Sequence, residues 1–274
     1  MINALSFDIE DWFQVENLKS AIAYGDWDHL ELRVVRNTEL ILRILKDFDT
    51  KATFFVLGWV AERCPELVRE ISAGGHEIAS HGYSHQLVYD MTEESFAKDI
   101  RMAKDILEDI TKERVLGYRA PSFSITKESL WALDILKKEG YTYDSSIFPI
   151  SFHDRYGFTG CSDRPFLWPN GLAEIPLSVY RVRGFSLPLA GGGYFRLLPY
   201  AYFKFFLKRL NRNQNNFTFY LHPWEFDPDQ PRVDVPLGYR FRHYVNLKYT
   251  EKYLRRLLKD FSFERLCVAH GLES

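Results

Sequence analysis

Two histidines four residues apart carry the clearest chemical signal in this sequence. They are His81 and His85, separated by a glycine, a tyrosine and a serine. Side chains four apart lie on one face of a helical turn, with Cβ atoms about 5–6 Å apart, so both imidazoles can reach one metal ion. Zinc and related ions need a third protein ligand. Without a third ligand, the pair would be two ordinary loop histidines.

Three acidic residues near the N-terminus could supply that ligand. Asp8, Glu10 and Asp11 follow an apolar segment and precede Trp12 and Phe13. Three carboxylates this close repel one another, so at a buried strand end they need a cation or a shared proton. A metal ion would satisfy one of them and an arginine another. The alternative is a solvated loop that caps a helix.

An isolated arginine and an isolated histidine add to this set. Arg119 lies at a mostly apolar strand end, where it needs an anionic partner. His222 follows the apolar run 217–221, and its place at a strand end favours a general acid over a structural histidine. Together these residues supply two imidazoles and a carboxylate for a metal, a second carboxylate for a base, and a third imidazole for an acid. Metal-assisted hydrolysis requires such a set.

The first half of the chain predicts how these residues are positioned. Strand patterns over 4–8, 51–57, 76–80, 115–119 and 141–144 alternate with helical patterns over 33–48, 65–73, 92–110 and 126–138. Such alternation implies right-handed crossovers and a parallel sheet covered on both faces. The candidate residues, Asp144 among them, fall at the carboxyl ends of these strands. In a parallel barrel that edge carries the active site.

The second half of the chain is less regular. We expect residues 145–200 to form a loop-rich insertion with short strands. Beyond it, the patterns predict helices over 198–210 and 250–259 and strands over 216–222 and 261–269.

The composition limits the class of protein. A length of 274 residues fits one large α/β domain over residues 1–274, and 46% hydrophobic residues can form a sizeable core. A net charge of −2 gives no nucleic-acid footprint. The 16% of aromatic residues would suit stacking on sugars if some rings lined a cleft. There is no basic leader and no apolar stretch long enough for a membrane helix, so we expect a cytoplasmic protein without a membrane span.

Five segments resemble the motifs of the polysaccharide deacetylases of the NodB-homology type, carbohydrate esterase family four. In chain order they are Phe7-Asp8-Ile9-Glu10-Asp11, Ser80-His81-Gly82-Tyr83-Ser84-His85, Arg119-Ala120-Pro121-Ser122-Phe123, Tyr143-Asp144-Ser145-Ser146 and Tyr220-Leu221-His222. Their order and spacing match over roughly residues 4–225. The runs 191–195 and 222–227 are similar to the subgroup found with exosortase-linked exopolysaccharide loci. The chain departs from the usual adjacent Asp-Asp pair, and its fourth motif lacks the usual tryptophan.

The resemblance implies a fold, a cofactor and a reaction. The fold would be a distorted (β/α) barrel with seven or eight parallel strands. One divalent metal ion, with Zn²⁺ as the expected ion, would be bound by Glu10, His81 and His85, and Asp11 is the competing carboxylate. The reaction would be hydrolysis of an N-acetyl group on an amino-sugar polysaccharide or oligosaccharide.

The resemblance also implies roles for the remaining residues. Asp8, held by Arg119, would act as the base, and His222 as the acid, oriented by Asp144. A backbone N–H near Ser122 or Phe123 would stabilise the oxyanion.

Two other functions stay open from the sequence. One is an amide hydrolase of the same scaffold that acts on a small cyclic amide or a formylated lipid-sugar, which a closed small pocket would favour. The other is a non-catalytic carbohydrate-binding protein that uses its aromatic residues. The sugar and the oligomeric state are not specified by the sequence.

Overall fold

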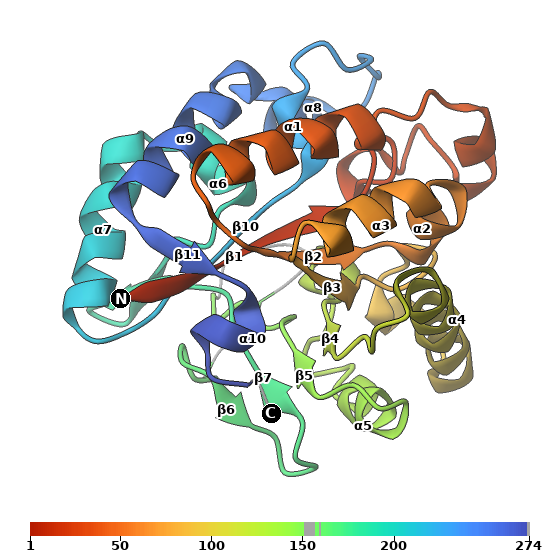
Figure 1. The fold of residues 1–274 in the computed structure, drawn as a ribbon, viewed down its shortest axis with the longest axis horizontal. Helices are drawn as coiled ribbons and strands as arrows, with labels where there is room; N and C mark the ends of the chain where they lie inside the picture. Colours follow the sequence, from red (N-terminus) through yellow and green to blue (C-terminus); the bar gives the residue numbers. More distant parts are fainter. Residues whose placement is uncertain (151–156, 159, 273–274) are drawn as a thin grey trace.

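A curled, mostly parallel sheet forms the centre of the protein (Figure 1). The structure, a computed structural model, describes residues 1–150, 157–158 and 160–272. Along the sheet the strands run in the order β10 (Thr218–Leu221), β1 (Ile2–Ile9), β2 (Thr53–Val56), β3 (Glu77–Ser80), β4 (Gly117–Tyr118), β5 (Tyr143–Asp144), β7 (Ala173–Glu174) and β6 (Phe166–Leu167). A further strand, β11 (Ser262–Glu264), pairs with β1 off this path. Among these described strands, every pair is parallel except β6 with β7. The predicted distorted barrel with seven or eight parallel strands is confirmed, as a half-barrel with β10 and β6 at its ends.

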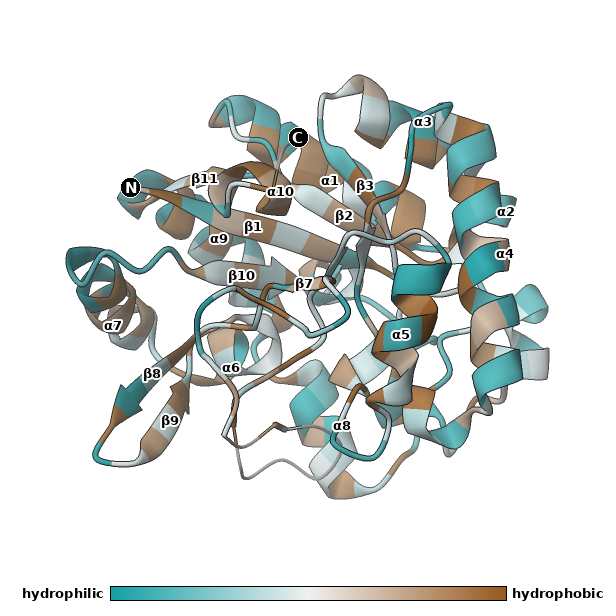
Figure 2. Cartoon of the chain, turned by 90° about the horizontal axis from the view of Figure 1, so that it is seen from below, coloured by the Kyte–Doolittle hydropathy of each residue, from teal (hydrophilic) through white to brown (hydrophobic). Residues whose placement is uncertain are grey.

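Helices surround this sheet (Figure 1). They are α1 (Val34–Asp47), α2 (Gly58–Arg63), α3 (Pro65–Ala73), α4 (Glu93–Thr111), α5 (Trp131–Lys138), α6 (Gly192–Leu197), α7 (Tyr200–Arg212), α8 (Leu237–Tyr244), α9 (Thr250–Asp260) and α10 (Leu266–Ala269). Short 3₁₀ helices cover Glu16–Leu18, Tyr24–His29, Val88–Asp90, Pro121–Phe123, Pro223–Phe226 and Leu247–Tyr249. In Figure 2, α4, α5 and α7 each carry both hydrophobic and hydrophilic residues, as expected of helices that pack on a sheet with one face in water. Among the described residues, no helix is both long and apolar enough to cross a bilayer.

Helix starts follow local capping chemistry. Thr92 caps α4, because its hydroxyl accepts the N–H of Ser95 at 3.2 Å. The prediction for the next helix is wrong at its start. Thr126 lies in a turn, where its N–H donates to Ser129 Oγ at 2.9 Å, and α5 begins only at Trp131.

The predicted closing strand over 261–269 is only partly correct. β11 ends at Glu264, and α10 follows it. The chain turns because the N–H of Leu266 donates to the Thr53 hydroxyl at 2.8 Å. Leu266 and Ala269 of α10 belong to a buried cluster inside the curled sheet, together with Ala4, Phe55, Ala79, Tyr143, Ala173 and Ile175. The turn into α10 therefore buries apolar side chains against the sheet.

The predicted insertion over 145–200 contains β6, β7, α6 and a separate hairpin, β8 (Val179–Val182) with β9 (Phe185–Pro188). Residues 151–156 and 159 of this segment lie outside the described residues. β7 extends the main sheet beside β5. α6 and the start of α7 lead back to β10, beside β1. The second half of the chain therefore completes the sheet that the first half begins.

Candidate active site

Three of the predicted metal ligands meet at the carboxyl edge of the sheet. Glu10 follows β1, and His81 and His85 follow β3. One ligand atom from each lies within 4.8 Å of the other two, and all three residues are buried. The sequence predicted this proximity, and the sheet explains it, because only β2 lies between β1 and β3.

The histidine loop is held by a side chain from α4. Asp99 accepts the backbone N–H groups of Tyr83 at 2.8 Å and Ser84 at 3.1 Å. Gly82 has a φ of +73°, and a Cβ there would lie 2.8 Å from an Asp99 oxygen. Only glycine suits this position, so the loop bends tightly and turns both imidazoles toward Glu10.

Hydrogen bonds define which atoms of the cluster are available to a metal ion. His81 Nδ1 lies 2.8 Å from the carbonyl oxygen of Arg119. A carbonyl can only accept, so Nδ1 carries the proton and Nε2 keeps its lone pair. Burial lowers the pKa of His81 to about 4, so the ring is neutral at neutral pH. A neutral imidazole with one oriented nitrogen is the form that binds metals.

Glu10 supplies an anionic oxygen that lacks a donor. Burial raises its pKa, but His85, His222 and His81 together outweigh burial and hold the pKa well below the usual value. One oxygen accepts the indole N–H of Trp224 at 3.0 Å. The other, Oε2, is buried and accepts no hydrogen bond of acceptable geometry, while His85 Nε2 lies only 2.5 Å away, a separation that requires a proton or a cation between the two atoms. An orphaned carboxylate oxygen beside two imidazoles fits a divalent cation such as Zn²⁺.

Asp11, the competing carboxylate, points elsewhere. Its oxygens accept the backbone N–H groups of Trp12 at 2.8 Å, Arg33 at 2.6 Å and Val34 at 2.9 Å. The last two belong to the start of α1, so Asp11 satisfies free donors at a helix N-terminus. Burial raises the pKa of Asp11 to about 6 despite these hydrogen bonds. The structure therefore brings Glu10, and not Asp11, to the histidines.

Asp8 and Arg119 form a buried ion pair beside this cluster. Arg119 Nη1 donates to Asp8 Oδ1 at 2.7 Å, and the arginine is fully buried. Its other donors are used by Ser6 Oγ and by the backbone and hydroxyl oxygens of Ser145. Its guanidinium also lies 4.0 Å from the centre of the Phe55 ring. These contacts fix one oxygen of Asp8 and leave Oδ2 toward the cavity.

His222 faces both acids from the opposite side. Its Nε2 lies 3.9 Å from Asp8 Oδ2 and 3.6 Å from Glu10 Oε1. Its Nδ1 is 2.7 Å from Glu225 Oε1, and Glu225 also accepts the backbone N–H of His222. Burial lowers the pKa of His222, but the hydrogen bond to Glu225 and the charges of Glu10, Glu225 and Asp8 raise it to about 9.

Glu225 is itself held by a buried arginine. Arg196 Nε donates to Glu225 Oε2 at 2.6 Å, and both side chains are almost wholly buried. Arg196 also donates to the carbonyls of Arg242, His243 and Val245 at the end of α8. Burial raises the pKa of Glu225, but Arg196 and His222 outweigh it and keep the pKa below its usual value.

The expected contact between Asp144 and His222 is not found, which corrects that prediction. Asp144 accepts the Ser146 hydroxyl at 2.6 Å and is hydrogen bonded to Glu174 on the neighbouring strand. The register of β5 and β7 pairs these two acids directly. Burial raises the pKa of both, that of Asp144 to about 6 and that of Glu174 well above its usual value. The two carboxyls therefore share a proton.

Ser146 connects this acid pair to the arginine segment. Its hydroxyl accepts the N–H of Ala120 at 2.8 Å, directly after Arg119. In the same loop the N–H of Phe123 donates to the Ala120 carbonyl at 3.0 Å. Among the described residues the Ser122 N–H makes no such backbone hydrogen bond, so it is the one of the two predicted candidates whose N–H is left available. Ser122 has a φ of +51°, an uncommon conformation for a residue with a side chain.

A cavity of about 380 Å³ lies over this site. Of the ionisable residues above, its lining includes Asp8, Glu10, His81, His85, Arg196 and His222. It also includes a set of aromatic rings, namely Phe123, Tyr194, Tyr220, Trp224 and Phe241. Phe241 is 56% exposed, so it can present a ring to a ligand at the cavity mouth.

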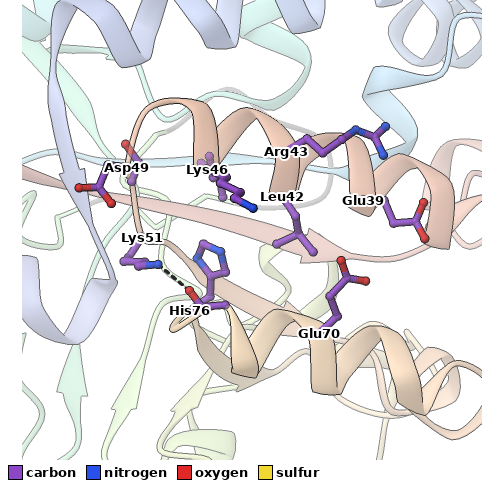
Figure 3. A pocket seen from close by; sticks show the side chains of 11 residues that line it. Glu39, Leu42, Arg43, Lys46, Asp49, Lys51, Glu70 and His76 are labelled. Atoms are coloured by element: carbon purple, nitrogen blue, oxygen red, sulfur yellow. Dashed lines mark hydrogen bonds between the residues drawn. The ribbon is translucent and has the colours of Figure 1, made fainter.

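A second cavity, of about 580 Å³, lies between α1 and α3 (Figure 3). It is lined by side chains of both charges, among them Arg43, Lys46 and Glu70. His76 points into it, but its Nδ1 already accepts the N–H of Ala52 at 3.2 Å, and Lys51 donates to the Gly74 carbonyl. None of the predicted site residues lines this cavity, so it is not where the chemistry is assembled.

Two family profiles divide the chain. Residues 20–143 match the polysaccharide deacetylase family, and residues 145–269 match DUF3473, a domain of unknown function. The first half of the chain is therefore similar to the polysaccharide deacetylases, and the second half to DUF3473. The resemblance inferred from the five motifs is confirmed.

Curated relatives match only part of the chain. Over 103 residues the chain is 37% identical to a peptidoglycan-N-acetylglucosamine deacetylase of Bacillus cereus, covering 38% of this chain and 34% of that protein. Over 125 residues it is 32% identical to a peptidoglycan deacetylase of Helicobacter pylori, covering 44% and 41%. The chain thus spans less than half the length of either relative.

Solved structures share the whole fold at low identity. A Mycobacterium smegmatis protein assigned to the polysaccharide deacetylases superposes with a TM-score of 0.64 and 21% identity, covering 98% of this chain and 88% of that one. PuuE allantoinase superposes with a TM-score of 0.60 and 17% identity over the same shares. At these identities the likeness establishes the fold alone.

Sequence reasoning missed Trp224, Glu225 and Arg196. Glu225 could have been predicted, because a glutamate three residues after His222 can close a local hydrogen bond. Arg196 carries no local signal, because its partner Glu225 lies 29 residues away.

Proposed function

We propose that this protein is a metal-dependent hydrolase that removes N-acetyl groups from an amino-sugar polysaccharide or oligosaccharide. One observation carries the proposal. An orphaned Glu10 oxygen and two imidazoles lie beside a carboxylate held by arginine and an imidazole held by glutamate, all in one cavity. The match of residues 20–143 to the polysaccharide deacetylase family and the peptidoglycan deacetylases among the relatives favour acetyl transfer to water as the reaction.

A divalent ion bound by Glu10, His81 and His85, with Zn²⁺ as the expected metal, would polarise the acetyl carbonyl and acidify a water molecule. Asp8 accepts the proton of the attacking water on the oxygen that Arg119 leaves free. The water oxygen bonds to the acetyl carbon, and the developing oxyanion accepts the Ser122 N–H.

His222 completes the reaction. Its Nε2 donates a proton to the amide nitrogen as the C–N bond breaks, releasing acetate and a free amine. Glu225 keeps the ring oriented and protonated for this step. Asp144, bound to Ser146, positions the backbone on which Arg119 lies.

The aromatic lining favours a sugar as the ligand. Rings at the mouth, above all the exposed Phe241, offer faces on which pyranose rings can stack. We also infer that residues 1–274 act as one domain, because acids from β1 in the first half and His222 from the second half face the same cavity.

The test is acetate release by the metal-loaded full chain. Substrates are N-acetylated oligosaccharides of peptidoglycan and exopolysaccharide type, with a small cyclic amide as the rival substrate. We expect acetate and free amine in equal amounts from at least one glycan. Hydrolysis of the cyclic amide alone would favour the rival amide hydrolase. Sugar binding without hydrolysis by a metal-loaded protein would favour a non-catalytic role.

A further inference from the structure

Charge is distributed unevenly along this chain. Residues 175–224 contain seven lysines and arginines and no aspartate or glutamate, although the whole chain has a net charge of −2. Three of the seven have carboxylate partners outside the segment, namely Arg181, Arg196 and Lys204. The other four are exposed, and no carboxylate of the described residues lies within ion-pair distance of them: Arg183, Lys208, Arg209 and Arg212.

The β8–β9 hairpin carries apolar side chains at its tip. Its turn residues, Arg183 and Gly184, have φ values of +46° and +83°, as in a tight two-residue turn of type I′. Val182 and Phe185 pair across the hairpin next to this turn, so they point to the same side. They are 42% and 73% exposed. Figure 2 shows the hairpin projecting from the body of the protein beside α7.

Helix α7 extends this surface. The ring of Tyr180 in β8 packs on Phe206 of α7, with centroids 5.1 Å apart, which fixes the hairpin against the helix. Phe205 is 53% exposed, and the Arg209 guanidinium lies 5.3 Å from its ring centre. Lys208 and Arg212 follow at spacings of three and seven residues, on the same face of the helix as Phe205.

We infer that these two elements form a docking surface for an anionic lipid membrane. The basic-aromatic patch consists of Val182, Arg183, Phe185, Phe205, Lys208, Arg209 and Arg212. The tip is convex and projecting, so it does not form a groove for a peptide. An anionic polymer in water would attract the cations but leave the apolar tip exposed. A lipid surface satisfies both, because headgroups pair with the cations and the acyl boundary accepts the two apolar side chains.

This inference is independent of the catalytic proposal, since no residue of the patch lines the catalytic cavity.

The test is co-sedimentation of the full chain with vesicles. One set is phosphatidylcholine alone, and the other contains about 30 mol% phosphatidylserine, which supplies the negative surface potential. We expect binding to the anionic vesicles only, weakened by added salt because surface charges are screened.

Two variants separate the apolar and charged contributions. Val182→Ser/Phe185→Ser should weaken binding about tenfold, because the tip loses its apolar insertion. Replacing Arg183, Lys208, Arg209 and Arg212 with Gln should weaken binding by up to several hundredfold, since each of the four cations near such a surface contributes about fivefold. Matched controls are Leu167→Ser, at a residue 70% exposed on β6, and Lys46→Gln/Lys138→Gln at exposed sites on α1 and α5. The controls should bind like the parent.

The proposal is overturned if the parent does not bind anionic vesicles, or if the patch variants bind as well as the controls. A dimer that the tip variant abolishes, in a protein that ignores vesicles, would assign the patch to a second copy instead. Thermal unfolding and hydrolysis of a soluble substrate should be unchanged in every variant, so loss of fold is separated from loss of docking.

Discussion

Replacing Glu225 with Gln should shift the alkaline limit of the reaction. Glu225 contacts His222 Nδ1 at 2.7 Å and is wholly buried. Gln keeps the shape and one acceptor oxygen but removes a negative charge. The pKa of His222 is raised to about 9, and Glu225 contributes both a hydrogen bond and a charge to that rise.

The size of the shift follows from the separation. Two unit charges about 4 Å apart interact by roughly 4 kcal/mol at an effective dielectric constant near 20, which corresponds to about three pKa units. Nearby charges usually shift a pKa by about one to three units. We therefore expect the pKa of His222 to fall by about one to three units in Glu225→Gln. An acid must be protonated to work, so turnover is lost as pH rises through this pKa. The alkaline limb should move toward neutral pH by the same amount.

The assay is kcat against pH for parent and variant, each with its metal content measured. A bound cation offsets the charge of Glu10, so the limb of the loaded parent lies below the pKa quoted above, but the difference between the two proteins persists. Glu225→Gln also leaves Arg196 buried without its anionic partner, which typically costs about 3–5 kcal/mol of stability. The double variant Glu225→Gln/Arg196→Met removes that charge and serves as the stability control. An active, metal-loaded Glu225→Gln enzyme with the parent's alkaline limb would refute the reasoning.

Three further outcomes test the site. His85→Ala should lose most bound metal and most activity, because two ligands hold zinc poorly; full occupancy by metal analysis would remove His85 from the ligands. Glu10→Ala should likewise lose metal. Asp11→Ala should keep its metal but lose about 0.5–2 kcal/mol of unfolding free energy, because Asp11 caps α1. The opposite pattern in metal analysis and denaturant unfolding would exchange the roles of the two residues. Asp8→Asn should keep its metal and lose about 10²–10⁴-fold in turnover, because an amide cannot accept the proton of water; near-normal turnover would exclude Asp8 as the base.

Much of the site could be predicted from the sequence because it rests on local patterns. Apolar strands end in polar residues, and parallel strands bring their carboxyl ends to one edge. That was enough to bring together Asp8, His81 and His222 from three strands. The His-x-x-x-His spacing placed two ligands on one loop, although a bend at Gly82 rather than a helix aims them.

The choice between Glu10 and Asp11 needed the tertiary structure. Adjacent residues point in different directions, and the sequence does not say which direction faces the histidines. The start of α1 decides it, because its free N–H groups draw Asp11 away and leave Glu10 toward His85.

The partner of His222 was also decided by tertiary structure. Both Asp144 and Glu225 are acids near the right edge. Strand register pairs Asp144 with Glu174, and the two carboxyls share a proton. Asp144 is therefore not the partner of His222. Glu225 stays ionised because Arg196, from a helix far away in sequence, is buried against it. The sequence determined which kinds of groups meet at this edge. Long-range packing determined which carboxylates are charged and which atom each one faces, because burial and ion pairing depend on neighbours that no local pattern reveals.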